Sequence, residues 1–283
     1  MLDIILDTLI DSIKLLPFLF VTYLILEYLE HKTGGKAQNV IKKSGKFGPA
    51  IGSLLGIVPQ CGFSAAAANF YAGRVISLGT LIAIFLSTSD EMLPILISEA
   101  APISLIGKVI LIKLLIGMVC GFIIDLFSKF NNKEKNIEKE IEHLCEHDHC
   151  DCEHGVVKSA IKHSLNIFVF IIIVSFILNL LIHFIGEDTI SSIFNSNKIL
   201  GPILASFVGL IPNCASSVIL TQLNLSGVIP LSTMISGLLV NAGLGLLVLF
   251  RVNNNLKENI FITALLYISV VLFGFIVNIL LLW

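Results

Sequence analysis

Charged residues are scarce in this chain, and the motifs of several common protein classes are absent. Only 13% of its 283 residues are charged, and it has a single Trp. No run fits G-x-x-x-x-G-K-[ST], H-E-x-x-H or C-x-x-C, so the sequence excludes a P-loop motor, a zincin-type peptidase and a thioredoxin-like dithiol. Asp3, Asp7 and Asp11 stand where a cleavable signal sequence would have a basic region, so we expect no such signal.

Long apolar runs dominate the chain instead. The mean hydropathy of +0.94 is far above that of soluble domains, and about 20 apolar residues suffice for a helix to cross a bilayer. The sequence therefore predicts an all-α integral membrane protein. We expect spanning helices at roughly 13–30, 75–97, 102–127, 159–185, 228–250 and 259–282.

One stretch of the chain occurs twice. Residues 48–64 and 201–217 align without a gap at an offset of 153 residues, with 7 identities in 17 positions. Such a fixed offset indicates a duplicated half-protein. Pro59 and Pro212 each remove a backbone donor, so we expect a broken helix in each copy. The identical pairs are Gly48/Gly201, Pro49/Pro202, Ser53/Ser206, Gly56/Gly209, Pro59/Pro212, Cys61/Cys214 and Ser64/Ser217.

Charge distribution indicates whether the repeated segments cross the membrane. If each one crosses, the Lys-rich loop at 31–47 and the charged linker face opposite sides. If each one enters and returns, 14 of the 18 Lys and Arg residues fall on one side, which the positive-inside rule assigns to the cytosol. We therefore expect re-entrant hairpins at about 48–72 and 200–224.

This topology gives each half three spanning helices and one broken hairpin, ten helical segments in all. The two halves then have opposite orientations, an arrangement found in many transporters. The predicted division is membrane repeat 1 at 1–127, a cytosolic linker at 128–157 and membrane repeat 2 at 158–283. We expect a multi-pass protein of the plasma membrane with both termini outside.

Three features together resemble a known family. They are the doubled Gly-Pro then Gly-x-x-Pro-x-Cys pattern, the run Ser87-Thr88-Ser89-Asp90-Glu91 and a central linker rich in Cys and His. The chain is similar over its whole length to the ten-helix heavy-metal exporters, relatives of the ArsP-type arsenic efflux permeases that are often labelled manganese transporters. The resemblance implies a metal or metalloid permease and does not identify the ion.

Cys61 and Cys214 are the first candidate ligands. Each follows its helix-breaking Pro by two residues, after a carboxamide, Gln60 or Asn213. Two thiols brought together would form a soft site for thiophilic ions. A free Cys is often only a small buried hydrophobe, and a redox pair is a further alternative, but recurrence beside a doubled break favours a place in the transport path.

Asp90 and Glu91 lie deep in the apolar run at 75–97, and Lys113 lies deep in the next one. Ionisable groups at such depth are costly and indicate function. The carboxylates are candidates for proton coupling or hard oxygen ligands, and Lys113 is a candidate partner for either of them. The alternative is that both acids are solvated near the outer interface.

Four further polar residues are expected to line the substrate path. Small hydroxyl residues are also ordinary packing contacts between membrane helices, and that alternative stays open for them. The four are Ser64, Ser217, Thr88 and Asn241.

The linker has a dense group of potential metal ligands. Thiolates and imidazoles at this density hold zinc-like ions, although the spacing is not that of a folded zinc finger, and three thiols could hold trivalent arsenic. The alternative is a charged linker with incidental Cys and His. The residues are His143, Cys145, His147, His149, Cys150, Cys152 and His154.

The interpretation that joins these features is a secondary exporter working by alternating access, and not an enzyme. We expect the lipid bilayer, the ion and protons as partners, no nucleic acid, no cofactor beyond the transported ion, and a homodimer as one assembly. Thiols and imidazoles favour zinc, cadmium, copper or arsenic(III), whereas carboxylates and hydroxyls favour manganese. A membrane thiol oxidoreductase using Cys61 and Cys214 and a non-transporting metal sensor are the alternatives of other classes.

Overall fold

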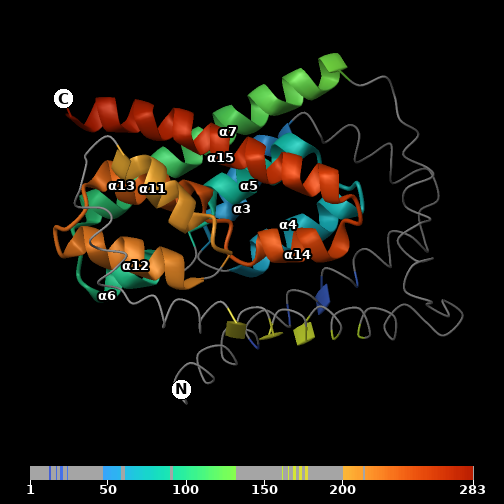
Figure 1. The fold of residues 1–283 in the computed structure, drawn as a ribbon, viewed down its shortest axis with the longest axis horizontal. Coiled ribbons are helices and arrows are strands. Elements are labelled where there is room, and N and C mark those ends of the chain that lie inside the picture. The colour runs from blue at the N-terminus through green and yellow to red at the C-terminus, as the bar shows by residue number, and fades with distance from the viewer. Residues whose placement is uncertain are drawn as a thin grey trace, which may run out of the picture.

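The computed structural model describes most of the two repeats. The described residues are 47–58, 61–89, 92–131, 200–212 and 214–282, with separate positions between 13 and 24 and between 161 and 177. The labelled elements in this part of the chain are all α-helices (Figure 1). The linker beyond residue 131 and most of the spans predicted at 13–30 and 159–185 lie outside the described residues.

The helices of the second half repeat those of the first in order and in length. The first half contains α3 (Gly48–Gly56), α4 (Cys61–Ala72), α5 (Leu78–Ser87), α6 (Met92–Ser98) and α7 (Ile103–Asn131). The second half contains α11 (Leu200–Gly209), α12 (Cys214–Leu225), α13 (Leu231–Val240), α14 (Gly245–Val252) and α15 (Leu256–Leu282). The starts of α12 to α15 lie 153 residues after those of α4 to α7, the offset of the sequence repeat.

The break predicted in each repeated segment is confirmed. Helix α3 ends at Gly56 and α4 begins at Cys61, while α11 ends at Gly209 and α12 begins at Cys214. Pro212 and, by its equivalent place in the sequence, Pro59 account for the two breaks, because proline lacks the N–H that would continue the helix.

The spans predicted at 75–97 and 228–250 have the length and composition to cross a membrane, but each contains an interruption that was not predicted. Each consists of two successive helices, α5 with α6 and α13 with α14. The second break is stabilised without proline: Gly243 has a positive φ of 53°, and its N–H donates to Asn241 Oδ1 at 2.9 Å. A side chain that binds its own backbone two residues on offers the chain an alternative to helix.

Glycines fix how α3 packs on α5. A Cβ added at Gly48 would lie 2.2 Å from Thr80 Oγ1, and one at Gly56 would lie 2.1 Å from Ser87 Oγ. With Gly52 between them, these glycines lie four residues apart, a spacing of small residues that lets two backbones approach closely. The start of α3 contacts the start of α5, and the end of α3 contacts the end of α5, so the two helices run in the same direction. Helix α4, which joins them in the sequence, brings the chain back.

The second half repeats this packing. Gly201 lies against Thr233 near the start of α13, and Gly209 lies against Gly237 and Val240 near its end. Helices α11 and α13 therefore also run in the same direction.

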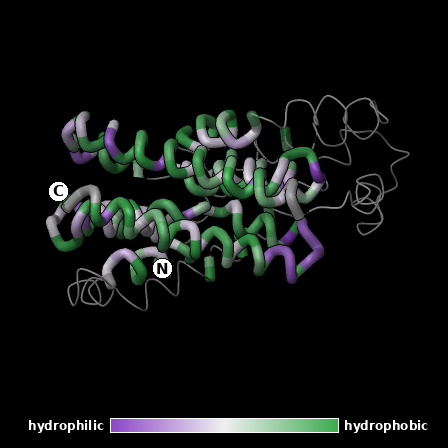
Figure 2. Tube along the Cα trace, turned by 90° about the horizontal axis from the view of Figure 1, so that it is seen from above, coloured by the Kyte–Doolittle hydropathy of each residue, from purple (hydrophilic) through white to green (hydrophobic). Residues whose placement is uncertain are grey.

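The longest helices lie on the outside of the bundle. In Figure 1, α7 and α15 extend along one side of the molecule, and apolar side chains such as Leu115 on α7 and Leu272 on α15 are exposed. Figure 2 shows the hydrophobic colouring that runs along most of the helices. Exposed apolar helix surface of this kind suits a lipid environment.

Four helical stretches of the described residues have the length and composition to cross a membrane. Two of them are the outer helices, and the other two are the interrupted pairs, which are mostly buried. The spans predicted at 75–97, 102–127, 228–250 and 259–282 are thus confirmed, by length and composition, for this part of the chain. The stretches are Leu78–Ser98, Ile103–Ser128, Leu231–Val252 and Leu256–Ile279.

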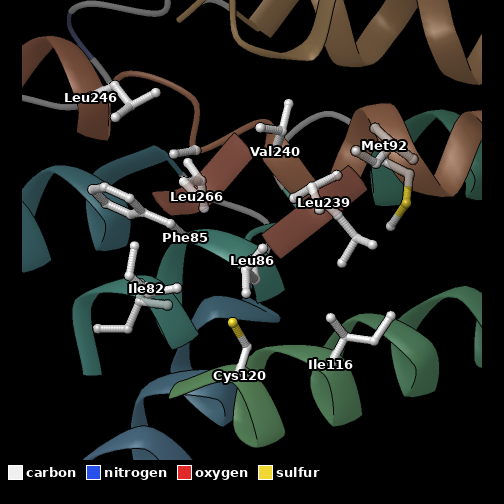
Figure 3. Packing of buried hydrophobic residues seen from close by; sticks show 14 of the residues in the cluster. Ile82, Phe85, Leu86, Met92, Ile116, Cys120, Leu239, Val240, Leu246 and Leu266 are labelled. Atoms are coloured by element: carbon white, nitrogen blue, oxygen red, sulfur yellow. The ribbon is translucent and has the colours of Figure 1, made fainter. Parts of the chain in front are cut away.

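The core lies where the two halves meet. Helix α4 packs against α14, α12 packs against α6, and α5 touches α13. The α4–α14 and α12–α6 contacts each join elements of different halves. The repeat relates one contact to the other, because α12 corresponds to α4 and α14 corresponds to α6. Figure 3 shows side chains of both halves gathered beside the interrupted helices, among them Phe85, Met92, Leu239, Leu246 and Leu266.

Candidate functional site

Four interruptions of helix, here called the central breaks, define the site. Each one leaves backbone N–H and C=O groups without partners in a helix. Irregular backbone of this kind persists at membrane depth only inside protein or along a wet cavity. The central breaks are the segments between successive helices at 57–60, 88–91, 210–213 and 241–244, of which residues 59, 60, 90, 91 and 213 are outside the described part of the chain.

Contacts join the breaks of the first half to the second half. Gly56, at the end of α3, packs on Ser87, at the end of α5. One residue further on, Thr88 O accepts a hydrogen bond from Lys113 Nζ. The same ammonium donates to Leu238 O of α13 at 2.8 Å, so one buried cation contacts the ends of two interrupted helices.

The break at 241–244 and Gly245 just beyond it contact the starts of α4 and α12. Asn241 Nδ2 donates to Ser216 Oγ at 3.2 Å, which lies in the first turn of α12. At the other end of this break, a Cβ on Gly245 would lie 2.8 Å from Ser64 Cβ, in the first turn of α4. The turns that begin with Cys61 and Cys214 therefore approach one short segment from two sides.

The structure brings several predicted site residues to this centre. Ser64, Ser217, Thr88 and Asn241 are all buried, with at most 3% of each residue exposed. The Asn241 side chain donates a hydrogen bond to Ser216 of α12. Thr88 Oγ1 donates to Ile84 O at 2.7 Å, a local bond to the carbonyl four residues earlier that hydroxyl side chains in helices often make.

Lys113 is at the centre, as its depth in the sequence predicts, with 1% of its surface exposed. Its predicted pairing with a carboxylate involves residues outside the described part of the chain. The same holds for most of the predicted ligands, whose roles stay predictions. They are Gln60, Asn213, Asp90, Glu91, the side chains of Cys61 and Cys214, and the linker residues His143, Cys145, His147, His149, Cys150, Cys152 and His154.

Among the residues that the structure does describe, no group of three or more His, Cys, Asp and Glu side chains could hold a metal ion. The chemistry offered by the described part of the centre is that of helix ends. Helix starts present N–H groups and partial positive charge, and helix ends present carbonyls and partial negative charge. Discontinuous helices use both to bind the ligands and ions of transporters.

Sequence reasoning missed three contributors to the site. The carbonyls of Thr88 and Leu238 have no signature in the sequence, because any residue type supplies a carbonyl. Ser216 was missed because its repeat equivalent is Phe63, so the internal comparison drew attention to Ser217 instead. The break at 241–244 was not predicted either, although Asn and Gly within an apolar run are a pattern that favours a turn.

Polar residues at the ends of the outer helices cap their neighbours. Asp125 Oδ1 accepts from Gly79 N at 2.8 Å, and Asp125 Oδ2 accepts from Ser77 Oγ at 2.7 Å. In the second half, Asn278 Oδ1 accepts from Ser232 Oγ at 2.8 Å. Asp125 thus caps the start of α5.

Comparison with known proteins gives one family. A family model described as "Putative, 10TM heavy-metal exporter" matches residues 1–154 and 132–275. No curated protein matches the chain. No solved structure matches it either.

Proposed function

Because the chain belongs to that family of 10TM heavy-metal exporters, we propose that it is a secondary-active transporter that exports a metal or metalloid ion by alternating access. The substrate site is the meeting point of the central breaks. The observation that carries the proposal is that the first turns of α4 and α12 both contact the segment 241–245.

Opposite orientation of the two halves is part of the proposal, and three contacts support it. Gly245, at the start of α14, lies against Ser64, near the start of α4. Just beyond the far ends of these helices, Glu258 accepts from Tyr71 and pairs with Arg74 at 2.7 Å. Helices α4 and α14 therefore run side by side in one direction, from the centre to one face of the protein.

This direction determines the course of the second half. If α13 and α14 form one interrupted span, α13 starts at the face opposite to that of Arg74 and Glu258. Helix α5 starts beside the loop that holds Arg74 and runs the other way. Since α3 runs along with α5 and α11 runs along with α13, the two hairpins enter from opposite faces, as inverted repeats require.

At the centre, Cys61 and Cys214 would supply soft sulfur ligands, with Gln60 and Asn213 beside them, and Ser64, Ser217, Thr88 and Asn241 as polar lining. Soft ligands favour zinc, cadmium, copper or arsenic(III). Asp90 or Glu91 would exchange protons for the ion. The Cys and His residues of the linker would collect the ion on the cytosolic side.

A manganese transporter is the second candidate. It is favoured by the contact of Thr88, which precedes Asp90 by two residues in the sequence, with Lys113 at the centre. Carboxylate and hydroxyl oxygens suit this harder ion. A membrane thiol oxidoreductase that uses Cys61 and Cys214 would instead form a mixed disulfide with a protein substrate.

Flux through sealed proteoliposomes tests the proposal. Manganese, zinc, cadmium and arsenite are offered separately, with and without a pH gradient, to vesicles that contain the full chain. We expect movement of one of the soft ions and acceleration by the gradient. Absence of protein-dependent movement for all four ions contradicts the proposal.

Three variants separate the candidates. Loss of flux in Cys61→Ser and Cys214→Ser, with Asp90→Asn unaffected, supports a soft thiol site. The reverse pattern supports manganese. A variant lacking residues 141–154 should still transport, because the linker collects the ion without forming the path; a non-transporting sensor would show no flux in either form.

A further inference from the structure

The interrupted helices of the two halves present carbonyl oxygens to a common point. Thr88 O belongs to the residue that caps the end of α5, and Leu238 O lies in the last turn of α13. Both are among the carbonyls that a helix end leaves without an intrahelical partner. Both accept from the ammonium of Lys113.

The charges at this point favour a cation. Two helix ends direct their partial negative charges toward it. The distance of 2.8 Å from Lys113 Nζ to Leu238 O is normal for a charged hydrogen bond. An ammonium that is 99% buried is costly to desolvate unless oxygens such as these replace its water.

The site belongs to the protein as a whole and not to each half. Lys113 lies on α7 and reaches across to α13 of the other half. Its equivalent at the offset of 153 residues is Leu266, which is fully buried in the apolar core. The duplication therefore provides one ammonium at the centre where strict symmetry would provide two.

We propose that Thr88 O and Leu238 O form a cation-binding site that the chain fills with its own Lys113 ammonium. Lys113 is a positioning residue: it holds the ends of α5 and α13 together without a dissolved ion. A further consequence rests on the proposed function. The transporter without substrate changes its orientation with the Lys113 ammonium already bound to these carbonyls, so it needs no sodium or potassium ion at this point.

Removal of the amine tests the site directly, with no need for transport. The Lys113→Ala variant is purified in choline chloride, and its melting temperature is followed as methylammonium chloride or potassium chloride replaces choline at constant ionic strength. A small cation that binds only the folded protein raises the melting temperature. We expect a saturable rise of about 5 °C with methylammonium and a smaller one with potassium.

Wild-type protein and Lys108→Ala are the controls. Lys108 lies on the same helix, α7, and is exposed, so neither control opens a space at the centre, and neither should respond. If Lys113→Ala gives no folded protein in choline, the yield of folded protein with methylammonium present throughout purification becomes the measurement, and we expect methylammonium to raise it.

The proposal is overturned if methylammonium shifts Lys113→Ala no more than it shifts the controls, or fails to raise the folded yield. The result is independent of the flux experiment. If the melting temperature of Lys113→Ala depends on the cation but the protein moves no metal, the cation site is supported and the exporter is rejected. If the protein moves metal but the melting temperature does not respond, the exporter is supported and the cation site is rejected.

Discussion

At the scale of single residues, capping side chains set where the inner helices begin. Asp125 reaches from α7 to the first turn of α5 and accepts from both Gly79 N and Ser77 Oγ. In the second half Pro230 replaces Ser77, and Thr233 Oγ1 is a buried hydroxyl without a hydrogen-bond partner among the described residues. The first half thus has the better-satisfied helix start.

Replacement of Asp125 separates charge from capping. Asp125→Ala removes the acceptor from Gly79 N and should cost about 1 kcal/mol, as loss of a helix cap does. Asp125→Asn keeps one acceptor oxygen, as Asn278 does naturally in the second half, and should cost less. Thermal unfolding of both variants in detergent measures the difference. If both variants lose the same stability, the negative charge of Asp125, and not its role as a hydrogen-bond acceptor, stabilises the helix start.

At the scale of elements, glycine determines how closely the inner helices approach. The sequence repeat drew attention to Gly56 and Gly209 as parts of a motif beside a break. The structure gives them a packing role, because a Cβ at Gly209 would lie 2.1 Å from Gly237 O. The neighbour is backbone, so it cannot yield as a flexible side chain would.

Gly209→Ala should therefore destabilise the protein by about 1–3 kcal/mol, the usual cost of overpacking a core. Gly107→Ala is the matched control, since it also lies in a helix but a Cβ there would meet nothing within 4 Å. Alanine is favoured over glycine within a helix, so this control should keep or raise the melting temperature. A similar fall in both variants would contradict close packing as the cause.

The element boundaries show what sequence could and could not predict. The breaks before Cys61 and Cys214 were predictable because proline marks them and the repeat doubles the signal. The breaks at 88–91 and 241–244 were not predicted, because their polar residues sit in apolar runs long enough to cross a bilayer. Which hydroxyls pack and which face the centre depends on tertiary contacts, and a sequence does not contain those distances.

At the scale of the whole molecule, an ion pair joins the two halves at one face. Arg74 and Glu258 approach within 2.7 Å, and Arg74 has a positive φ of 56° where its repeat equivalent is Gly227, with a φ of 76°. Glycine adopts this conformation freely, whereas Arg pays for it. The pair thus distinguishes the face that holds Arg74 from the face that holds Gly227.

Inverted repeats predict that these two faces lie on opposite sides of the membrane. Epitope tags inserted after Gly227 and after Asn254, in separate variants, test this with an antibody that does not cross membranes. In sealed inside-out vesicles the tag after Asn254 should be accessible and the tag after Gly227 should be protected. Access to both tags, with flux retained, would contradict opposite orientation of the halves.

The presence of Lys113 in one half and Leu266 in the other limits which separately expressed halves could assemble into a working protein. An assembly of two first halves would bring two ammonium groups into one dry centre, where like charges repel strongly. An assembly of two second halves would bring no ammonium group, so the carbonyl groups at the centre would have no cation between them. Fusion of the copies into one polypeptide let a single charge serve both, so halves expressed separately can restore the protein only as an unlike pair.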